Sequence, residues 1–190
     1  NTFKMPNLKK NFSDALEFVN NKVCFVRCDL NLPIVDNKIT DFTRLDEIIP
    51  TLEKLISRNG KIILISHLGR PKGKVDENLS LEMMIPHLEE RLKRSIVFCK
   101  EQILSSETAE KIKKLPPKGV LLLENIRFYK QEEENDKKFS SKISEYGDSY
   151  INESFSTSHR NHASITGISS FLPSFPGTLF EQEIKNLNVI

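Results

Sequence analysis

The sequence predicts an α/β fold, a three-layer sandwich in which helices cover both faces of a central, mostly parallel sheet. Short segments rich in Val, Ile, Leu and Phe alternate along the chain with amphipathic segments of helical length. This alternation indicates right-handed βαβ units. Polar residues follow several of the apolar segments. An open parallel sheet binds ligands beyond the carboxyl ends of its strands, so these residues are the first candidates for a site.

Five short apolar segments are predicted as strands because they are rich in β-branched and aromatic residues. They are residues 22–28, 61–66, 95–99, 119–124 and 148–152. The second of them, KIILIS, has a continuous apolar run. Such a run is expected in a strand that is covered on both faces.

The segments between the strands predict helices. Residues 44–58 carry Leu and Ile at helical spacing, and Gly60 is placed to end that helix at its C′ position. Further helices are predicted at residues 80–93, at 105–114, in the segment that ends at Tyr146, and at 180–187. The long loop 29–43 contains Pro33 and a turn at Asp36-Asn37. The acidic stretch 131–136 is interpreted as a solvent-exposed loop and helix start.

Length and composition fit one soluble globular domain covering residues 1–190, with 38% apolar and 28% charged residues. No apolar run approaches the roughly 20 residues of a membrane span, and no secretory signal is visible, so a cytoplasmic location and no membrane partner are expected. Cys24, Cys28 and Cys99 are expected to be buried and reduced. The C-x3-C spacing of the first two leaves a metal or redox site as an alternative.

The basic residues point to a site for a small anion. The net charge of +2 argues against a nucleic-acid partner, and the chain has 20 Lys but only 8 Arg. Five arginines lie at or just after predicted strand ends: Arg27, Arg44, Arg70, Arg127 and Arg160. The planar guanidinium fork matches phosphate and carboxylate, so a ligand that carries these groups is expected at that edge of the sheet.

Four polar segments bring these arginines together with His, Asn and Asp. They are residues 27–33 with 41–44, 66–73, 123–128 and 152–164. Arg and His suit the charged groups of a ligand, while Asp and Asn suit a hydroxyl group. The predicted ligand is therefore a small molecule with phosphate, carboxylate and hydroxyl groups.

The four segments resemble the RxDxNVP, DxTR, SHLGRP, LLENxRF and HRxHAS motifs of the phosphoglycerate kinases, in that family's order and at about its spacing. The resemblance implies a Rossmann-like N-terminal domain that binds 3-phosphoglycerate or 1,3-bisphosphoglycerate. It implies, for the complete enzyme, reversible transfer of the acyl phosphate of 1,3-bisphosphoglycerate to ADP, giving ATP in glycolysis. It also implies a cytoplasmic monomer.

The resemblance assigns roles to individual residues. Asp29 and Asn31 would contact the glycerate part of the substrate, and Arg44 would bind its carboxylate and act as the catalytic residue that stabilises charge during transfer. Arg27 would support the basic patch through an ion pair. The substrate-binding set is completed by a run after the second strand and by two later arginines: His67, Leu68, Gly69, Arg70, Arg127 and Arg160. No metal ligand is implied.

Some positions depart from the family's pattern. Leu32 stands where Val is usual, and Glu153, Ser154 and Ser156 stand where Asp, Ala and Gly are usual. Ser156 makes the backbone of its loop less permissive. Neither G-x-x-x-x-G-K-[ST] nor G-x-G-x-x-G occurs in the sequence. The resemblance implies that Mg²⁺ and ATP or ADP are bound by a C-terminal nucleotide domain outside this chain. The chain alone is expected to hold no cofactor and to be inactive as a kinase.

Two other kinds of function remain as alternatives. A stand-alone nucleotide-binding or redox domain would share the alternation of strands and helices, but residues 27–31 lack the Gly-rich first turn that it needs. A non-catalytic module for a polyanion such as RNA would explain the basic residues, but aromatic residues are only 8% and Trp is absent. His159 and His162 have an H-x2-H spacing that would suit zinc only with further ligands.

Overall fold

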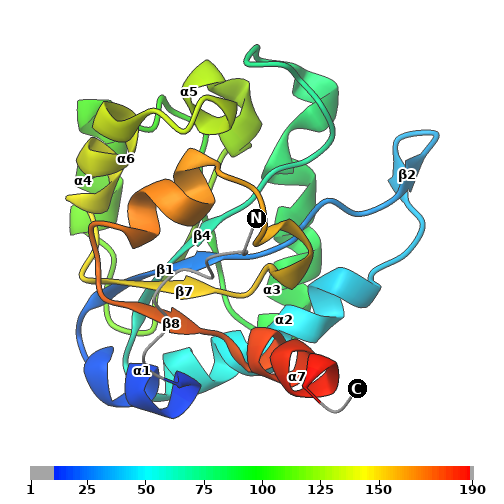
Figure 1. Ribbon diagram of the computed structural model, residues 1–190. Coiled ribbons are helices and arrows are strands. Elements are labelled where there is room, and N and C mark those ends of the chain that lie inside the picture. The colour runs from blue at the N-terminus through cyan, green and yellow to red at the C-terminus, as the bar shows by residue number, and fades with distance from the viewer. Residues whose placement is uncertain (1–10, 189–190) are drawn as a thin grey trace.

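A six-stranded sheet forms the centre of the structure, a computed structural model that describes residues 11–188 (Figure 1). The strand order is β5-β6-β4-β1-β7-β8, and every neighbouring pair is parallel. The bounds are β1 Val23–Arg27, β4 Lys61–Ile65, β5 Val97–Cys99, β6 Val120–Leu123, β7 Ser149–Asn152 and β8 Ser174–Pro176. The five predicted strands are confirmed. The edge strand β8 was not predicted.

Seven α-helices connect and flank these strands in the described residues. They are α1 Phe12–Phe18, α2 Thr43–Ser57, α3 Ile85–Leu92, α4 Ser106–Lys113, α5 Lys130–Glu133, α6 Lys137–Ser144 and α7 Thr178–Leu187. The helix predicted at 80–93 is a 3₁₀ helix, Leu81–Met84, followed by α3, with Pro86 in the first turn of α3. Proline has no N–H for a bond to the preceding turn, so an α-helix begins there more easily than it runs through.

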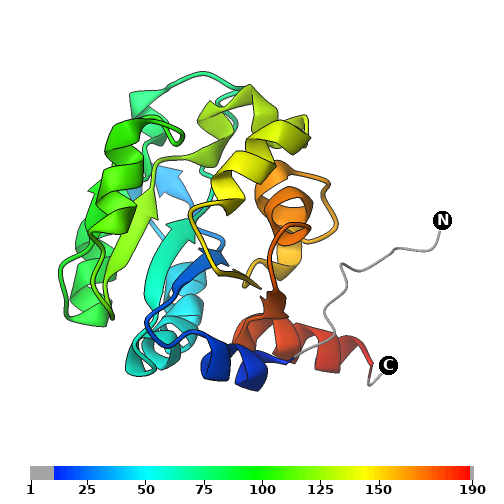
Figure 2. The ribbon, with the colours of Figure 1, turned by 90° about the vertical axis from the view of Figure 1, so that its left-hand side faces the viewer.

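Alternate residues of the strands face two separate cores. In β4, Ile62 and Leu64 belong to one apolar cluster and Ile63 and Ile65 to the other. The first cluster is completed by α1, α2 and α3, and the second by α4, α6 and a π-helical turn at Ala163–Gly167. Figures 1 and 2 show α1, α2 and α7 on one side of the sheet and α5, α6 and the π-helical turn on the other. The predicted three-layer arrangement is confirmed.

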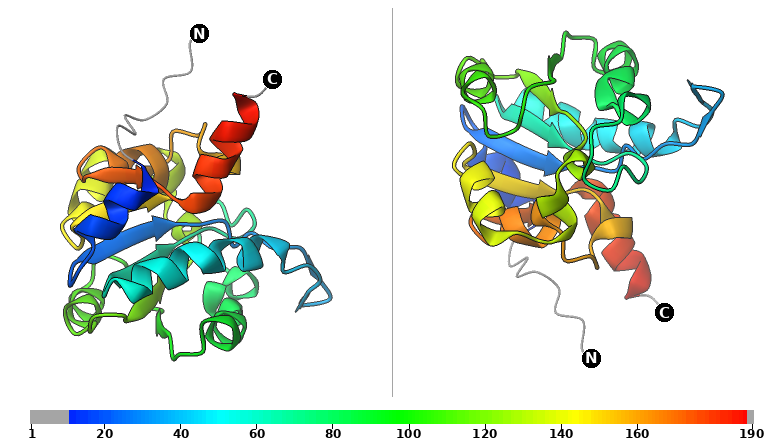
Figure 3. Two further views of the ribbon diagram at one scale, coloured as in Figure 1. Left: turned by 90° about the horizontal axis from the view of Figure 1, so that it is seen from below. Right: turned by 90° about the horizontal axis from the view of Figure 1, so that it is seen from above.

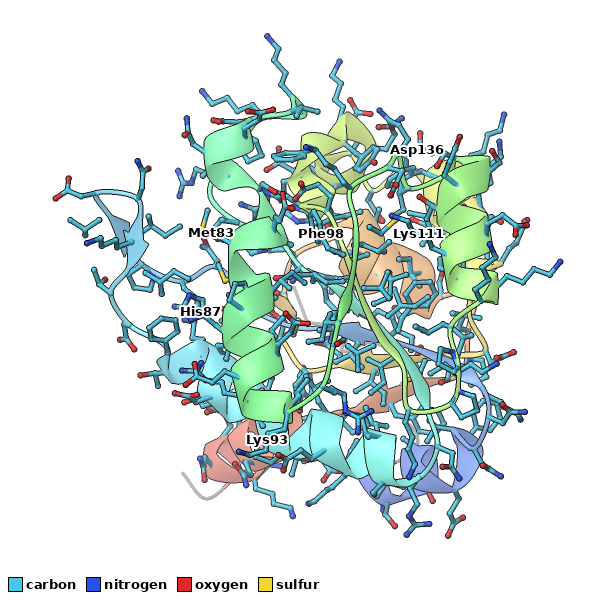
Figure 4. The ribbon with its side chains drawn as sticks, turned by 180° about the vertical axis from the view of Figure 1, so that it is seen from behind. Met83, His87, Lys93, Phe98, Lys111 and Asp136 are labelled. Atoms are coloured by element: carbon cyan, nitrogen blue, oxygen red, sulfur yellow. The ribbon has the colours of Figure 1, made fainter. Side chains whose placement is uncertain are left out.

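The helix α3 also meets the start of α2. Figure 4 views α3 from its outer side, and there His87 is directed toward the first turn of α2. The rings of His87 and Phe42 have centroids 4.6 Å apart. This contact steadies the end of α2 that carries Arg44.

The other end of α2 differs from the expectation by one residue. Asn59, and not Gly60, has a positive φ of 61° and occupies the C′ position. The N–H of Asn59 donates to the carbonyl oxygen of Ile56 and that of Gly60 to Leu55, both at 3.0 Å. These two bonds form a Schellman motif, in which Asn tolerates the left-handed conformation.

The loop after β1 forms a two-stranded hairpin of β2, Ile34–Val35, and β3, Lys38–Ile39. The predicted turn is confirmed: Asp36 and Asn37 have φ values of 50° and 59°, as a type I′ turn requires. Figure 3 shows the hairpin projecting on the side toward which the arrowheads of the parallel strands point. That side carries the predicted polar segments.

The three cysteines, Cys24, Cys28 and Cys99, are buried and free, as expected. Among residues 11–188, every helix is too short or too polar to cross a membrane.

Candidate functional site

The site lies at the carboxyl edge of the sheet, where the chain leaves two neighbouring strands in opposite directions. From β1 it runs through α2 to β4, and from β7 it runs to β8 on the other side. Arg27, the last residue of β1, is in register with Ile65 of β4 and with Asn152 of β7. Loops that diverge in this way favour a crevice for a ligand, and the four predicted polar segments follow strands that end at this edge of the sheet.

Asn125 holds the loop that follows β4. Its side chain is fully buried, and its Nδ2 donates to the carbonyl oxygens of Leu68 at 2.7 Å and of Leu79 at 2.9 Å. Its Oδ1 accepts from the N–H of Leu68 at 3.3 Å and of Arg127 at 3.0 Å. Leu68, predicted as a binding residue, is itself buried in the core, and its N–H is paired with Asn125.

Sequence reasoning did not single out Asn125 as a site residue. Its signal was its position directly after a strand, between Glu124 and the arginine of the third segment. A buried amide that uses both its donor and its acceptor atoms for backbone groups is a rigid joint, because each bond lost would leave an unpaired polar atom.

Gly69 connects two other predicted binding residues, Asn31 and Arg127. Its φ is +63°, and a Cβ atom at this position would lie 2.8 Å from Leu79 Cδ2, so only glycine fits without displacement. Its N–H donates to Asn31 Oδ1 at 3.0 Å, and its carbonyl oxygen accepts from Arg127 Nη1 at 3.1 Å. Loops after β1, β4 and β6 therefore meet at this residue.

Arg44 lies in the first turn of α2, so the expectation that it sits at or just after a strand end is wrong. It nevertheless reaches the loop after β1, because its Nη1 lies 3.3 Å from Asp29 Oδ2 and donates to the carbonyl oxygen of Asn31 at 3.1 Å. Its side chain is 51% exposed, so the guanidinium stays accessible. Ser156 also donates to Asp29 Oδ2, at 3.1 Å, so the unusual serine of the fourth segment is part of the same cluster.

Arg27 is completely buried and has a supporting position, as expected. Its Nη1 donates to the carbonyl oxygen of Cys28, its Nη2 to His67 Nδ1 at 2.9 Å and its Nε to Ser164 Oγ at 2.9 Å. The expected ion pair is not direct. The hydroxyl of Ser164 donates to Glu132 Oε1 at 2.6 Å and so links the carboxylate to the guanidinium.

Glu132 corrects the expectation that the whole stretch 131–136 is exposed to solvent. It is fully buried beneath the π-helical turn, whose Ser164 N–H donates to Glu132 Oε2 at 3.0 Å. Burial raises the pKa of this carboxyl group, while the nearby Arg27 lowers it in part. Its neighbours Glu133 and Glu134 are exposed.

His67 is 3% exposed and is surrounded by positive charge. Burial and then the charges of Arg27, Arg127 and Arg160 lower the pKa of the His67 imidazole to about 2. Arg127 is buried too, and its pKa is lowered by burial and by the neighbouring Arg160. These mutual effects arise because the three guanidinium groups approach one imidazole.

Arg70 and Arg160 present free guanidinium groups. Arg70 follows Gly69 and is exposed, and Arg160 is partly exposed. Neither side chain makes a hydrogen bond or an ion pair with any part of residues 11–188. Cavities of about 240 Å³ and 530 Å³ both touch Arg44, one beside Asp29 and the other beside Asn31.

The donor set of the site suits an anion. Guanidinium groups and a neutral imidazole dominate it, and these bind phosphate and carboxylate groups. Within the described part of the chain, no group of three or more His, Cys, Asp or Glu side chains is arranged to hold a metal ion. His162 instead places its Nδ1 3.8 Å from the buried Glu132 Oε1.

Comparison with known proteins identifies relatives of this site and fold. The family model described as phosphoglycerate kinase matches residues 14–190. The phosphoglycerate kinase of Finegoldia magna is 43% identical over 168 residues, which cover 88% of this chain and 42% of the relative. The cytosolic phosphoglycerate kinase of Triticum aestivum is 47% identical over 169 residues, which cover 87% of this chain and 41% of the relative.

Solved structures agree. That of the phosphoglycerate kinase from Coxiella burnetii has a TM-score of 0.82 at 29% identity, covering 90% of this chain and 42% of its own. That from Pyrococcus horikoshii has a TM-score of 0.80 at 34% identity, covering 90% of this chain and 44% of its own. The chain thus spans less than half the length of the relatives that it matches. Since the family model matches nearly the whole sequence, the chain belongs to the phosphoglycerate kinase family.

Proposed function

We propose that residues 1–190 form the N-terminal domain of a phosphoglycerate kinase, the domain that binds 3-phosphoglycerate or 1,3-bisphosphoglycerate. In the complete enzyme, the acyl phosphate of 1,3-bisphosphoglycerate would pass reversibly to ADP, giving 3-phosphoglycerate and ATP in glycolysis. The observation that carries the proposal is the convergence of Arg127, Arg160 and His67 at one edge of the sheet, with Arg44 joined to them through Asn31 and Gly69.

Each group of 3-phosphoglycerate has a matching partner. Arg44 would take the carboxylate, which would replace Asp29 as the partner of its Nη1. Asp29 and Asn31 would then bind the hydroxyl group. Arg127 and the two free guanidinium groups, Arg70 and Arg160, would hold the phosphate, together with the imidazole N–H of His67.

Arg44 would also act in the transfer itself. Phosphoryl transfer depends on positioning and on neutralising charge at the moving group. The Arg44 guanidinium, which is half exposed and lines two cavities, would stabilise that charge on the carboxyl oxygen and the phosphoryl group.

Among residues 11–188 we find none that match magnesium or the nucleotide. No metal-holding group occurs among residues 11–188, and the sequence has neither of the two common Gly-rich phosphate loops. A C-terminal nucleotide domain would bind both, and closure of the two domains would exclude water. The 190-residue chain alone is therefore expected to show negligible turnover with ATP and 3-phosphoglycerate in a coupled assay. Substantial turnover would contradict this part of the proposal.

We further propose a cytoplasmic monomer that has no nucleic-acid or membrane partner. The wheat relative is named as cytosolic. Three buried free cysteines also fit a reducing compartment.

Isothermal titration of the chain tests the proposal. We expect 3-phosphoglycerate to bind, while Mg-ATP and a single-stranded oligonucleotide bind poorly. Arg160→Gln should weaken 3-phosphoglycerate binding by about tenfold or more, because a hydrogen bond to a charged group is worth about 1.5–3 kcal/mol.

Arg58→Gln is the matched control, since Arg58 is exposed at the far end of α2 and should leave binding unchanged. Binding of the oligonucleotide without 3-phosphoglycerate would instead favour the polyanion-binding module and would overturn the proposal.

A further inference from the structure

We propose that Glu132 and Ser164 are positioning residues that hold the imidazole of His67 in one orientation and one tautomer through the buried guanidinium of Arg27. The inference deepens the proposed function and rests on it for the role of His67 toward substrate. Its geometric part concerns only this chain and can be tested without substrate.

A continuous chain of hydrogen bonds connects the four side chains. Glu132 Oε1 accepts from Ser164 Oγ at 2.6 Å, Ser164 Oγ lies 2.9 Å from Arg27 Nε, and Arg27 Nη2 lies 2.9 Å from His67 Nδ1. Glu132, Ser164 and Arg27 are fully buried, and His67 is 3% exposed. Water cannot replace any of these partners, so each bond constrains the next one.

The chemistry of arginine determines which group donates and which accepts in each of these hydrogen bonds. A guanidinium has donors and no acceptor, so His67 Nδ1 must accept from Arg27 Nη2 and Ser164 Oγ must accept from Arg27 Nε. The hydroxyl proton of Ser164 is therefore left for Glu132, which also accepts the backbone N–H of Ser164 at 3.0 Å. Because Nδ1 accepts, the proton of the neutral imidazole is on Nε2, the nitrogen that does not face Arg27.

The surrounding charges keep this arrangement. Arg27, Arg127, Arg160 and His162 all act against protonation of His67, in addition to its burial. At the other end of the hydrogen-bond chain, the Glu132 carboxylate balances the charge of Arg27. Arg127 is nearby, and His162 Nδ1 lies 3.8 Å from Glu132 Oε1. A neutral imidazole with its N–H on Nε2 can donate to a phosphate oxygen without changing its own charge.

The backbone around Ser164 is also held in place. Its carbonyl oxygen accepts from the hydroxyl of the buried Tyr150 at 2.9 Å, and it lies in the π-helical turn. A π-helical turn is uncommon and is often found at functional sites. Here it places the N–H and the hydroxyl of one residue on the two oxygens of one carboxylate.

Nitrogen-15 NMR of the imidazoles in the ligand-free 190-residue chain tests the geometry. We expect His67, assigned by the loss of its signals in His67→Gln, to be protonated on Nε2 and to keep these shifts between about pH 5.5 and pH 8.5, although a free imidazole titrates near 6.5. If His67 of the wild-type chain is protonated on Nδ1, or titrates near its ordinary pKa, the proposal is overturned before any variant is made.

Variants then test whether Ser164 and Glu132 cause this state. Ser164→Ala removes the hydroxyl that links Arg27 to Glu132 and should give His67 a mixture of tautomers. Ser164→Thr keeps the hydroxyl and should keep the native spectrum. Glu132→Gln puts an amide group opposite the Ser164 N–H and hydroxyl, which both need acceptors, and should resemble Ser164→Ala. The control is Ser144→Ala, because the Ser144 hydroxyl donates only to the carbonyl oxygen of Ser141, at 2.6 Å, within α6.

Substrate titration separates this inference from the proposed function. We expect Ser164→Ala to weaken 3-phosphoglycerate binding by about tenfold and Ser164→Thr to change it by less than about threefold. If folded Ser164→Ala and Glu132→Gln keep the native His67 spectrum, the positioning role is wrong, whatever binds. If the spectra change as expected but the wild-type chain does not bind 3-phosphoglycerate, the positioning role stands and the proposed function fails.

Discussion

The inner and outer halves of the site use arginine in opposite ways. The inner half consists of Arg27 and Arg127, which are buried and donate to protein groups such as His67 Nδ1 and the Gly69 carbonyl oxygen. The outer half consists of Arg44, Arg70 and Arg160, all at least partly exposed, and the side chains of the last two make no hydrogen bond or ion pair within the described residues.

The difference separates the structural role of Arg27 from the proposed ligand-binding role of the outer arginines, and Arg127 takes part in both. A buried charge must be paired and hydrogen-bonded, and removing one member of such a set leaves another charge uncompensated. An exposed ion pair contributes about 0–1 kcal/mol, so an outer arginine can exchange its partner for a ligand at little cost. Substitution of Arg27 should therefore lower stability, substitutions in the outer half should lower binding or turnover, and substitution of Arg127 should lower both.

The largest expected effect on stability in the inner half is that of Arg27→Met. The change leaves the Glu132 carboxylate buried without its compensating charge, and Ser164 Oγ and His67 Nδ1 lose their donors. We expect the free energy of unfolding of the 190-residue chain to fall by about 3–5 kcal/mol, measured by urea denaturation.

Arg58→Met serves as its control, because Arg58 is exposed outside the site, and it should change stability by less than about 0.5 kcal/mol. A loss below about 1 kcal/mol in Arg27→Met would mean that the buried guanidinium does not hold the inner half together.

Arg44→Ala should show the opposite behaviour in the complete enzyme. Removing a group that stabilises the charge of the transition state typically lowers turnover by about 10²–10³-fold, or about 2.7–4 kcal/mol. Stability should change by less than about 1 kcal/mol, because the Arg44 side chain of the ion pair with Asp29 is half exposed. Steady-state kinetics and urea denaturation of the same preparation measure both effects.

Arg44→Lys should also be poor, because a lysine lacks the planar pair of donors. Unchanged turnover in Arg44→Ala would remove the catalytic role assigned to this residue.

A smaller effect is expected on the pH dependence of the free energy of unfolding, which reports on His67 in the inner half. The pKa of His67 is about 2 in the folded chain and 6.5 as its ordinary value. Below about pH 6.5 the unfolded chain therefore binds a proton that the folded chain excludes, and stability falls as the pH falls. One proton corresponds to about 1.4 kcal/mol per pH unit.

His67→Gln should reduce this slope by nearly that amount near pH 5 and by about half of it near pH 6.5, measured by urea denaturation at several pH values. His162, whose pKa is also lowered, and Glu132, whose pKa is raised, titrate in both proteins. The difference between the two slopes therefore isolates His67. Equal slopes would show that the imidazole is not kept neutral by its surroundings.

Local patterns predicted most of the secondary structure and missed the parts that depend on distant partners. The strand β8 has only three residues, its last one is Pro176, and its place in the sheet comes from pairing with β7. Glu132 stands in a run of charged residues, so its neighbours indicated solvent. Only the packing of α5 against the π-helical turn buries it.

The candidate site was predicted in the same uneven way. The residue types after the strands indicated an anion site, and the parallel sheet brings Asn31, Gly69 and Arg127 together. The joints between the loops, Asn125 and Ser164, were not predicted as such. An Asn or Ser has many possible partners, and the sequence does not say which backbone or side-chain group will be near it.

The sequence by itself determined the fold class, because strand and helix periodicity is local, and the family, because ordered motifs are a property of the chain. Tertiary structure alone decided which arginines are buried and which are free for a ligand. Arg27 and Ser164 are separated by 137 positions and meet only after β1 and the π-helical turn have packed together. Burial, and with it the charge state of His67, depends on all the elements around a residue and so cannot be read from its neighbours in the chain.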